Sequence, residues 1–191
     1  MKTYILFGPP GAGKGTQAEK LARHFHLLHL STGDIFRREM ASGTPLGLEA
    51  KRYIEAGKLV PDEVTIAMLR GYLSSHPAHE GVILDGFPRT IPQAQALDQL
   101  LAEARMPLCR VFSLEVPDEE LIARLQNRAR TSGRSDDARL EVIQKRLEVY
   151  KAETLPLKEY YKNRGLLEEV EGTGAIEEIF SDICARIQKM P

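Results

Sequence analysis

The stretch GPPGAGKGT at residues 8–16 follows an apolar run, YILF at residues 4–7, and precedes a segment with helical spacing of small and apolar residues. This order predicts a strand, a glycine-rich turn and a helix. Residues 8–14 match the pattern G-x-x-x-x-G-K, whose glycines let successive backbone N–H groups converge on phosphate oxygens. The helix would point its positive end at the same spot, and Lys14 would add a mobile cation. The stretch therefore predicts a phosphate-binding loop.

The stretch departs from the general motif at one position. A Ser or Thr usually follows the lysine and binds Mg²⁺, but Gly15 stands there and the hydroxyl comes one residue later, at Thr16. We therefore expect Mg²⁺ to be held mostly by phosphates, waters and carboxylates.

Composition limits the classes of protein that fit. A chain of 191 residues with 42% hydrophobic residues is long and apolar enough for one domain with an ordinary core. Its net charge of −1 argues against general nucleic-acid binding, so an anion site must be a local cluster of Lys and Arg. The short apolar start does not resemble a signal peptide, and no segment is apolar enough for a membrane span.

The cysteines and histidines point away from metal or disulfide chemistry. Cys109 and Cys184 lie far apart in apolar stretches, so we expect two reduced core thiols in a cytosolic protein. The histidines have no cysteine near them in sequence, so we expect no structural zinc.

Strand-like and helix-like segments alternate along the whole chain, which predicts an α/β fold with a parallel sheet covered on both faces. The segment 31–60 is helical with a thin apolar stripe, so we expect it to form a flap on the core. After residues 4–7, the expected strands are 27–30, 82–85, 108–116 and 166–170, the last at an edge. A long helix is expected over 138–161 with a kink at Pro156, and the apolar stripes of the last two helices are Leu140, Ile143, Leu147 and Tyr150, then Ile176, Ile179, Phe180, Ile183 and Ile187.

Polar residues at strand ends mark a candidate site. Asp85 ends a buried strand beside the phosphate-binding loop, which suits Mg²⁺ and its waters better than a simple turn role. Thr32 and Arg37 follow another strand end, where they could face a ligand. The Ser31-x-x-Asp34 spacing also fits a plain helix cap.

Arginines surround a short polar turn at residues 131–137. Any one of them would ordinarily lie on a solvated helix face, but together their planar guanidinium groups suit a clamp on polyphosphate. No histidine or carboxylate stands out as a catalytic base, which favours a phosphate acceptor over an alcohol, because phosphate is already anionic near neutral pH. The arginines are Arg124, Arg128, Arg130, Arg134, Arg139 and Arg146.

With these motifs in hand, the chain resembles the adenylate kinases over essentially its whole length. The matching stretches are GPPGAGKGTQA at 8–18, STGD at 31–34 with Arg37, AGKLVPDE at 56–63, LDGFPRTIPQA at 84–94, GRSDD at 133–137 and KRLEVY at 145–150. The resemblance implies a P-loop fold of three α/β/α layers with a five-stranded parallel sheet and two small mobile flaps. The core would be 1–30, 61–128 and 138–191, the nucleoside-monophosphate flap 31–60, and the lid the short, cysteine-free turn 129–137.

The resemblance also implies reversible, Mg²⁺-dependent transfer of a phosphoryl group from ATP to AMP, giving two ADP, in a cytoplasmic monomer without nucleic-acid or membrane partners. The ATP site would comprise Gly11, Ala12, Gly13, Lys14, Gly15, Thr16, Arg124, Arg128 and the backbone near Gly174. The AMP site would comprise Thr32, Arg37, Lys58, Leu59, Val60, Gly86, Phe87, Pro88, Arg89 and Gln93, with Arg134 and Arg146 closing over the phosphates. The catalytic cations would be Lys14, Arg89, Arg124, Arg128, Arg134 and Arg146, and Asp85 would order waters on Mg²⁺.

Two positions bear on the choice of acceptor base. The similar UMP/CMP kinases usually have alanine in place of Thr32 and asparagine in place of Thr90, and Gln93 can pair with an adenine edge. These residues favour AMP, with a UMP/CMP or broad nucleoside-monophosphate kinase as the alternative. The segment from Asp137 to Arg146 is one residue longer than the usual family spacing, so the lid arginine falls on Lys145 or Arg146, and the KRLEVY stretch favours Arg146.

Two other classes of protein fit less well. A nucleotide-dependent switch would carry Asn-Lys-x-Asp and Asp-x-x-Gly signatures, which the chain lacks. A dinucleotide-binding module would need a third glycine where Thr16 stands.

Overall fold

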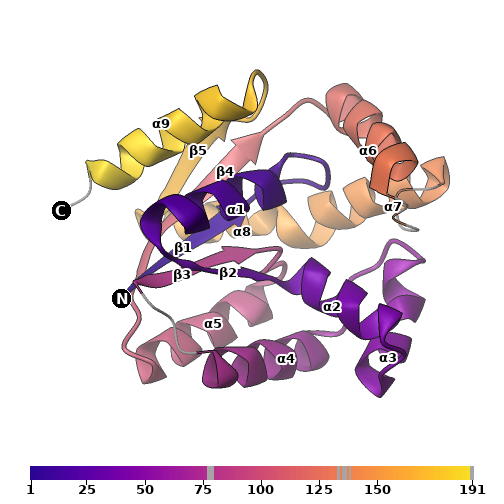
Figure 1. Ribbon diagram of the computed structural model, residues 1–191, viewed down its shortest axis with the longest axis horizontal. Coiled ribbons are helices and arrows are strands. Elements are labelled where there is room, and N and C mark those ends of the chain that lie inside the picture. Colours follow the sequence, from indigo (N-terminus) through magenta and orange to yellow (C-terminus); the bar gives the residue numbers. More distant parts are fainter. Residues whose placement is uncertain (77–79, 133, 135–136, 138, 190–191) are drawn as a thin grey trace.

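The structure is a computed structural model that describes residues 1–76, 80–132, 134, 137 and 139–189. Within that part of the chain, a five-stranded parallel sheet forms the middle layer, with strand order β2-β3-β1-β4-β5 (Figure 1). The α/β prediction is therefore confirmed, as is the edge position of the last strand. The strands are β1 (Lys2–Phe7), β2 (Leu28–Ser31), β3 (Gly81–Asp85), β4 (Leu108–Glu115) and β5 (Leu167–Glu171).

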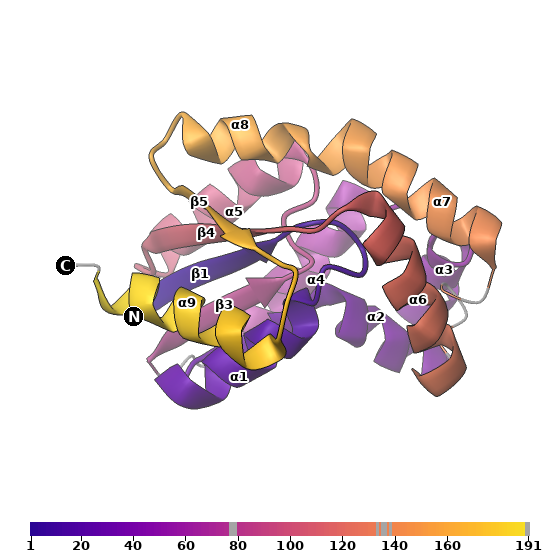
Figure 2. The ribbon, with the colours of Figure 1, turned by 90° about the horizontal axis from the view of Figure 1, so that it is seen from above.

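Helices cover both faces of this sheet. Figure 2 shows α1 (Lys14–Phe25) and α9 (Ile176–Gln188) on one side and α5 (Ile91–Glu103) and α8 (Pro156–Lys162) on the other. α4 (Asp62–Ser75) packs beside α5. The remaining described helices are α2 (Thr32–Ala41), α3 (Pro45–Ile54), α6 (Asp118–Ser132), α7 (Leu140–Val149) and the π-helical segment η2 (Tyr150–Thr154). None of the helices in the described ranges is long and apolar enough to cross a membrane.

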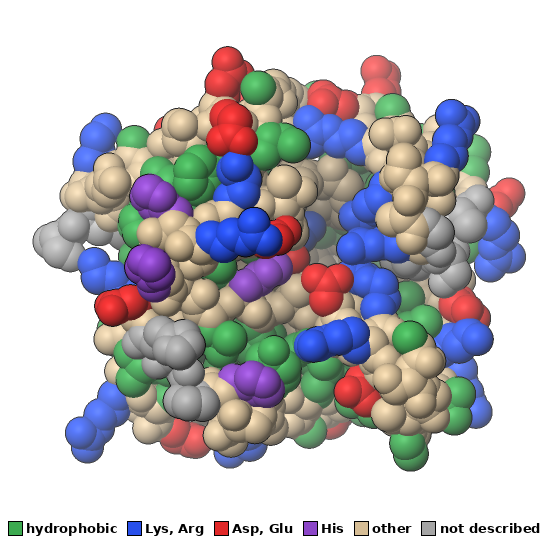
Figure 3. Space-filling model, in the orientation of Figure 1, with side chains coloured by type: hydrophobic (Ala, Val, Ile, Leu, Met, Phe, Trp, Pro, Cys, Tyr) green, Lys and Arg blue, Asp and Glu red, His purple; other side chains and the backbone are tan. Residues whose placement is uncertain are grey.

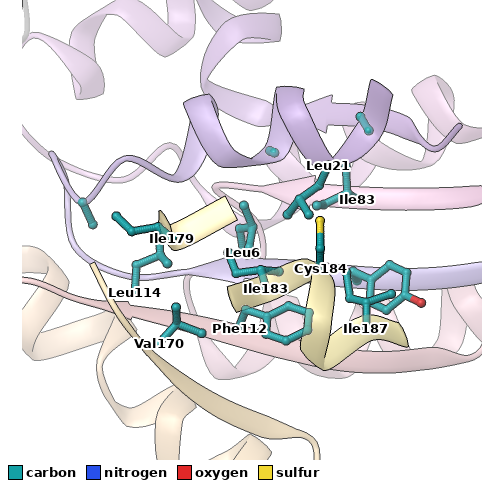
Figure 4. Close-up of a cluster of buried hydrophobic side chains, with 14 of the residues drawn as sticks. Leu6, Leu21, Ile83, Phe112, Leu114, Val170, Ile179, Ile183, Cys184 and Ile187 are labelled. Carbon is teal, nitrogen blue, oxygen red and sulfur yellow. The ribbon is translucent and has the colours of Figure 1, made fainter. Parts of the chain in front are cut away.

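The alternation of side chains along β1 explains why both faces must be covered. Tyr4 and Leu6 belong to the apolar cluster under α1 and α9, whereas Ile5 and Phe7 belong to the cluster under α4, α5 and α8. Successive strand residues point to opposite faces, so a strand that is apolar at every position needs a layer on each side. Figure 4 shows the first cluster, where side chains of α1 and α9 meet those of the sheet.

The segment 31–60 contributes the buried residues of a third, small apolar cluster. Phe36 of α2, Ala50 of α3 and Val60 are buried together, and Val64 and Met68 of α4 pack against them. Figure 1 shows α3 at the outside of the molecule, beyond α2.

The long helix expected over residues 138–161 is interrupted instead of simply kinked. α7 ends at Val149, the π-helical η2 follows, and α8 begins at Pro156. Proline cannot donate an N–H, and its ring clashes with the carbonyl four residues earlier. The π-helical turn makes room for the proline ring. In this turn the N–H of Leu155 donates to the carbonyl of Tyr150, five residues earlier, at 2.8 Å.

Two residues expected in the core are exposed, and a third is only partly buried. Leu140 and Ile176 are 43% and 51% exposed. Each is the first residue of its helix, where Cα–Cβ bonds tilt towards the N-terminus and carry the side chain beyond the packed face. Cys109 is only partly buried near the start of β4, while Cys184 is buried as expected, and both thiols are free.

Candidate active site

The predicted phosphate-binding loop, residues 8–16, packs closely against β4 and α6. Gly8 and Gly11 have φ values of 141° and 87°, in the region that favours glycine. A Cβ on Gly8 would lie 2.9 Å from the carbonyl oxygen of Leu114, and one on Gly11 would lie 3.0 Å from Cγ of Leu125. The loop conformation is therefore set by β4 and α6 beneath it, before any ligand binds.

Lys14 folds back over this loop. Its Nζ donates to the carbonyl oxygens of Gly8 and Pro9, each at 2.8 Å. Burial lowers the pKa of Lys14 to about 7; Asp85 acts in the opposite direction, and the nearby arginines, Arg89 foremost, add to the lowering. A poorly hydrated ammonium group surrounded by other cations is a strong site for an incoming anion.

One pocket links the loop to the segment 31–60. It encloses about 1010 Å³ of space, open solvent at its mouth included. The lining joins Gly8, Pro10 and Lys14 to Thr32, Gly33, Phe36, Arg37, Ile54, Gly57, Lys58, Leu59, Val60, Thr65, Gly86, Phe87, Pro88, Arg89, Gln93, Arg146, Val149 and Tyr150, among others. On the face drawn in Figure 3, Lys and Arg side chains gather between α6 and α2. Thus the predicted AMP residues lie together, apart from Arg134, with Lys14 at the same pocket.

The rest of the predicted set lies outside this lining. Gly11, Ala12 and Gly13 lie in the loop, where Ala12 is buried, and Gly15 and Thr16 lie at the start of α1. Arg124, Arg128, Arg134 and Gly174 also lie outside the lining. Arg124 donates to Glu120 at 2.5 Å and to the carbonyl of Gly172 at 3.0 Å, next to the turn that holds Gly174. We call the predicted site residues that line the pocket the enclosed half of the site, and those outside the lining the open half.

Hydrogen bonds shape the deep end of the enclosed half. Thr32 Oγ1 and Arg89 Nε both donate to the carbonyl oxygen of Gly86, at 2.9 and 2.8 Å. A Cβ on Gly86 would come within 2.9 Å of the Arg89 guanidinium and 3.0 Å of the Thr32 hydroxyl. The side chain of Gln93 is 2% exposed and contacts the backbone N–H of Arg89 and the carboxylate of Asp62.

A single buried carboxylate orients two of the arginines. Arg128 binds Asp137 through two hydrogen bonds, Nε to Oδ2 at 2.6 Å and Nη2 to Oδ1 at 3.0 Å, and Arg146 also donates to Oδ1. Burial would raise the pKa of Asp137, but the hydrogen bond from Arg128 and the charges of both arginines lower it below its usual value. Asp137 therefore stays ionised and holds the two guanidinium groups side by side.

The side chains of the two candidates for the lid arginine position lie in different surroundings. Arg146 lines the pocket and its side chain is 17% exposed, whereas Lys145 is 47% exposed and pairs with Glu148 at 3.2 Å. Arg146 is the residue that faces the site.

Asp34 makes a similar contact on the other side of the pocket. It accepts from Arg37 at 2.5 Å and lies 3.6 Å from Arg134. Ser31 also caps α2 by accepting from the N–H of Asp34 at 3.3 Å, so the capping interpretation of this spacing is correct, and α2 begins at Thr32.

The sequence predicts a capping position for Asp34, but it does not predict that Asp34, Asp62 and Asp137 orient side chains of the site. All three lie within stretches that carried the family resemblance, STGD, AGKLVPDE and GRSDD. The signal was an acidic residue beside predicted ligand-binding residues, but sequence alone does not say which arginine or amide an acid faces.

Asp85 fits a water-mediated role towards Mg²⁺. It ends β3, its side chain is 12% exposed, and Oδ2 lies 3.9 Å from Nε2 of His29. Burial would raise the pKa of Asp85, but His29 and the charge of Lys14 lower it, so the carboxylate stays ionised. Among the described residues no group of three His, Cys, Asp or Glu side chains could hold a metal alone. One carboxylate beside a phosphate loop suits a cation bound mainly by nucleotide and water.

Comparisons with known proteins agree on one family. The family model described as adenylate kinase matches residues 6–166. Among curated relatives named adenylate kinase, that of Carboxydothermus hydrogenoformans is 47% identical, with 97% of this chain and 99% of the relative covered. That of Bacteroides fragilis is 46% identical over the full length of both chains, and that of a Synechococcus strain is 50% identical over 98% and 97%.

Proposed function

The chain belongs to the adenylate kinase family, enzymes that transfer a phosphoryl group reversibly from ATP to AMP, and we propose that the residues of the candidate site perform this transfer in the roles set out below. ATP binds in the open half and AMP in the enclosed half. The alternative of a UMP/CMP kinase has no support among these relatives, which carry the name adenylate kinase.

The observation that carries the proposal is the pocket itself. It joins Lys14 of the phosphate loop to Thr32 and Gln93 at the deep end, with Arg89 and Arg146 also in its lining. An acceptor base held at the deep end would place its phosphate among the arginines, next to the cation that follows the transferred group.

The donor half rests on the loop and two arginines outside the pocket. Residues 11–16 cradle the ATP phosphates, Arg124 and Arg128 hold the phosphate chain, and the backbone near Gly174 meets the adenine. Support comes from the contact of Arg124 with the carbonyl of Gly172, which places this side chain beside that turn.

The acceptor half uses the flap and the turn after β3. Arg37 and Arg89 bind the AMP phosphate, residues 58–60, Thr32 and Gln93 enclose the base, and residues 86–88 support it. Arg134 and Arg146 close over the phosphates from the lid side.

In the chemical step, an oxygen of the AMP phosphate forms a bond to the γ-phosphorus of ATP as the bond to the bridging oxygen of ADP breaks. The acceptor oxygen is already ionised, so no base is needed. The task is to bring two anionic chains together and to neutralise charge on the transferred group, which Lys14, Arg89, Arg124, Arg128, Arg134 and Arg146 perform.

Adenylate kinases use Mg²⁺ together with ATP. When bound, Mg²⁺ neutralises phosphate charge and orients the donor chain. We assign Asp85 to ordering its water ligands, with no further protein ligand and no structural zinc.

The proposal extends to the organisation of the chain. Residues 31–60 act as the acceptor flap and 129–137 as a short lid, both closing on substrates over the core formed by the remaining residues. The apolar cluster that joins Phe36, Ala50 and Val60 supports a flap whose helices hold together as a unit, with Val64 and Met68 of α4 at its base. We also propose a cytoplasmic monomer, which two free thiols and dispersed exposed apolar side chains support.

An acceptor panel tests this function. Purified protein, Mg²⁺ and ATP are incubated with AMP, UMP, CMP, GMP or no acceptor, and the products are separated. We expect rapid formation of ADP with AMP, two ADP for each ATP consumed, and little product with the other acceptors. Preferred use of UMP or CMP would contradict the assigned roles of Thr32 and Gln93, and ATP loss that no acceptor stimulates would contradict the reaction.

A further inference from the structure

We propose that Asp62, which does not line the pocket, sets the base specificity of the acceptor site by fixing the orientation of the Gln93 side-chain amide. This inference rests on the proposed function, because it takes Gln93 as the residue that reads the base. Asp62 is the first residue of α4, and Gln93 lies in the first turn of α5.

Hydrogen bonds link Asp62 to Gln93 and Thr90, and link Gln93 to the backbone of Arg89. Its Oδ1 accepts from Nε2 of Gln93 at 2.8 Å and from Oγ1 of Thr90 at 3.0 Å. Oε1 of Gln93 accepts from the backbone N–H of Arg89 at 2.7 Å. Thr90 Oγ1 also accepts from the backbone N–H of Gln93 at 3.3 Å, so its own proton is available for Asp62. The Gln93 side chain is thus held from both ends.

These partners permit only one orientation of the amide. An ionised carboxylate can only accept, so the group facing Asp62 must be the amide nitrogen. A backbone N–H can only donate, so the group facing Arg89 must be the amide oxygen. Without Asp62, the orientation would depend on the single bond from Arg89.

A fixed amide distinguishes purine bases. One N–H and one lone pair of Gln93 remain for the pocket, which Gln93 lines at 2% exposure. Adenine offers an amino donor beside a ring-nitrogen acceptor, whereas guanine offers a carbonyl acceptor beside a ring N–H donor. For a base held at one position by the pocket walls, the orientation of the amide decides which of the two edges pairs. Asp62 therefore acts as a positioning residue for adenine.

The test measures kcat and KM for AMP and for GMP, two acceptors of similar size, in variants at position 62. For Asp62→Ala we expect the AMP:GMP ratio of kcat/KM to fall about tenfold, the effect of one hydrogen bond of this kind, through a higher KM for AMP with KM for ATP unchanged. Asp62→Asn keeps an acceptor oxygen but can also turn its amide, so we expect a smaller fall. Glu63→Ala is the matched control, because this exposed residue loses the same charge in the same helical turn, and we expect its ratio to stay at the wild-type value.

Gln93→Leu separates the inference from the proposed function. If Gln93→Leu lowers the AMP:GMP ratio but Asp62→Ala and Asp62→Asn do not, the role of Asp62 is overturned and the reading of the base by Gln93 stands. If Gln93→Leu leaves the ratio unchanged, both fail. If the proposal is right, adding Asp62→Ala to Gln93→Leu should change the AMP:GMP ratio no further. A lower melting temperature of Asp62→Ala with an unchanged AMP:GMP ratio would mean that Asp62 has a purely structural role, and would overturn the proposal. If Asp62→Ala does not fold, the ratio for Asp62→Asn decides.

Discussion

The proposed function assigns both the loop and the arginines of this site to phosphate binding, but their geometry is set in different ways. The loop is held by packing, since Gly8 and Gly11 leave no room for a Cβ against β4 and α6. The arginines are held by charge, since Asp137 orients Arg128 and Arg146 and Asp34 contacts Arg37. The loop is therefore shaped by the core, whereas the arginines are oriented by carboxylates that present oxygen atoms much as a phosphate does.

This difference has a functional consequence. A loop fixed by packing offers the same N–H groups to every donor nucleotide. In the proposed function, arginines fixed by carboxylates can exchange those partners for nucleotide phosphates when substrates bind. We expect substitutions in the loop to affect the chemical step most and substitutions of the carboxylates to affect assembly of the site.

The largest effect should come from removing the loop cation. Lys14→Met retains the length of the side chain but removes the charge that follows the transferred group. We expect kcat to fall about 10³-fold, with the melting temperature within a few degrees of wild type. Steady-state kinetics with ATP and AMP, combined with calorimetric melting, measure both. Near-normal turnover would contradict the role of Lys14.

A smaller loss of kcat should follow when Arg146 keeps its positive charge but loses its planar guanidinium group. Arg146→Lys preserves the cation and loses paired hydrogen bonding, so we expect kcat to fall about 10²-fold. The neighbouring exposed Lys145→Arg is the control and should change kcat little. Equal losses in the two variants would mean that the lid register is wrong.

The pH dependence of ATP binding distinguishes a partly buried lysine from an arginine. The pKa of Lys14 in the empty site is about 7, and bound phosphates favour the charged form, so binding above this pH requires proton uptake. ATP affinity should therefore fall by up to about tenfold per pH unit above pH 7. Titration calorimetry between pH 7.5 and 9 measures this slope. In Lys14→Arg, which stays charged, the slope should vanish, and an unchanged slope there would refute the assignment.

The smallest effect on turnover should come from the carboxylate that orients the arginines. Asp137→Asn keeps the shape and weakens both contacts, so we expect a several-fold loss of kcat and a loss of about 2 kcal/mol in the free energy of unfolding at neutral pH. Because the folded-state pKa of Asp137 is lowered, this stability is present above the usual value of 3.8 and is lost as pH falls through the lower folded-state pKa.

Denaturant unfolding at several pH values tests this prediction. The difference in the free energy of unfolding between wild type and Asp137→Asn should disappear at acid pH. Asp118→Asn, at an exposed ion pair with Lys151, is the control and should cost less than about 1 kcal/mol. If this difference in the free energy of unfolding persists at low pH, Asp137 acts through packing and not through its charge.

The same contrast explains what the sequence could predict. Apolar runs and glycine spacing are local, so the strands, the loop and Asp85 at the end of β3 could be predicted from residues close together in the chain. The exposure of Leu140 and Ile176 could not, because helical periodicity does not show where packing begins. The π-helical segment before Pro156 depends on how the chain restores hydrogen bonds around a proline, which spacing leaves open.

The candidate site divides in the same way. The sequence named the arginines but not the partners that orient them, because Asp34 approaches Arg134 across 100 positions and Asp62 approaches Gln93 across 31. Such contacts depend on how separate elements meet. The family resemblance predicted roles for the arginines and Gln93, and the structure showed which carboxylates contact them.

A bisubstrate analogue, with two adenosines joined by a polyphosphate chain, tests whether the loop and residues 31–60 bind both nucleotides in one continuous site. Its binding is measured by calorimetry. We predict one molecule bound per chain, competition with both ATP and AMP, and weaker binding in both Lys14→Met and Arg146→Lys. Two molecules bound per chain, or competition with only one of the two nucleotides, would contradict the account.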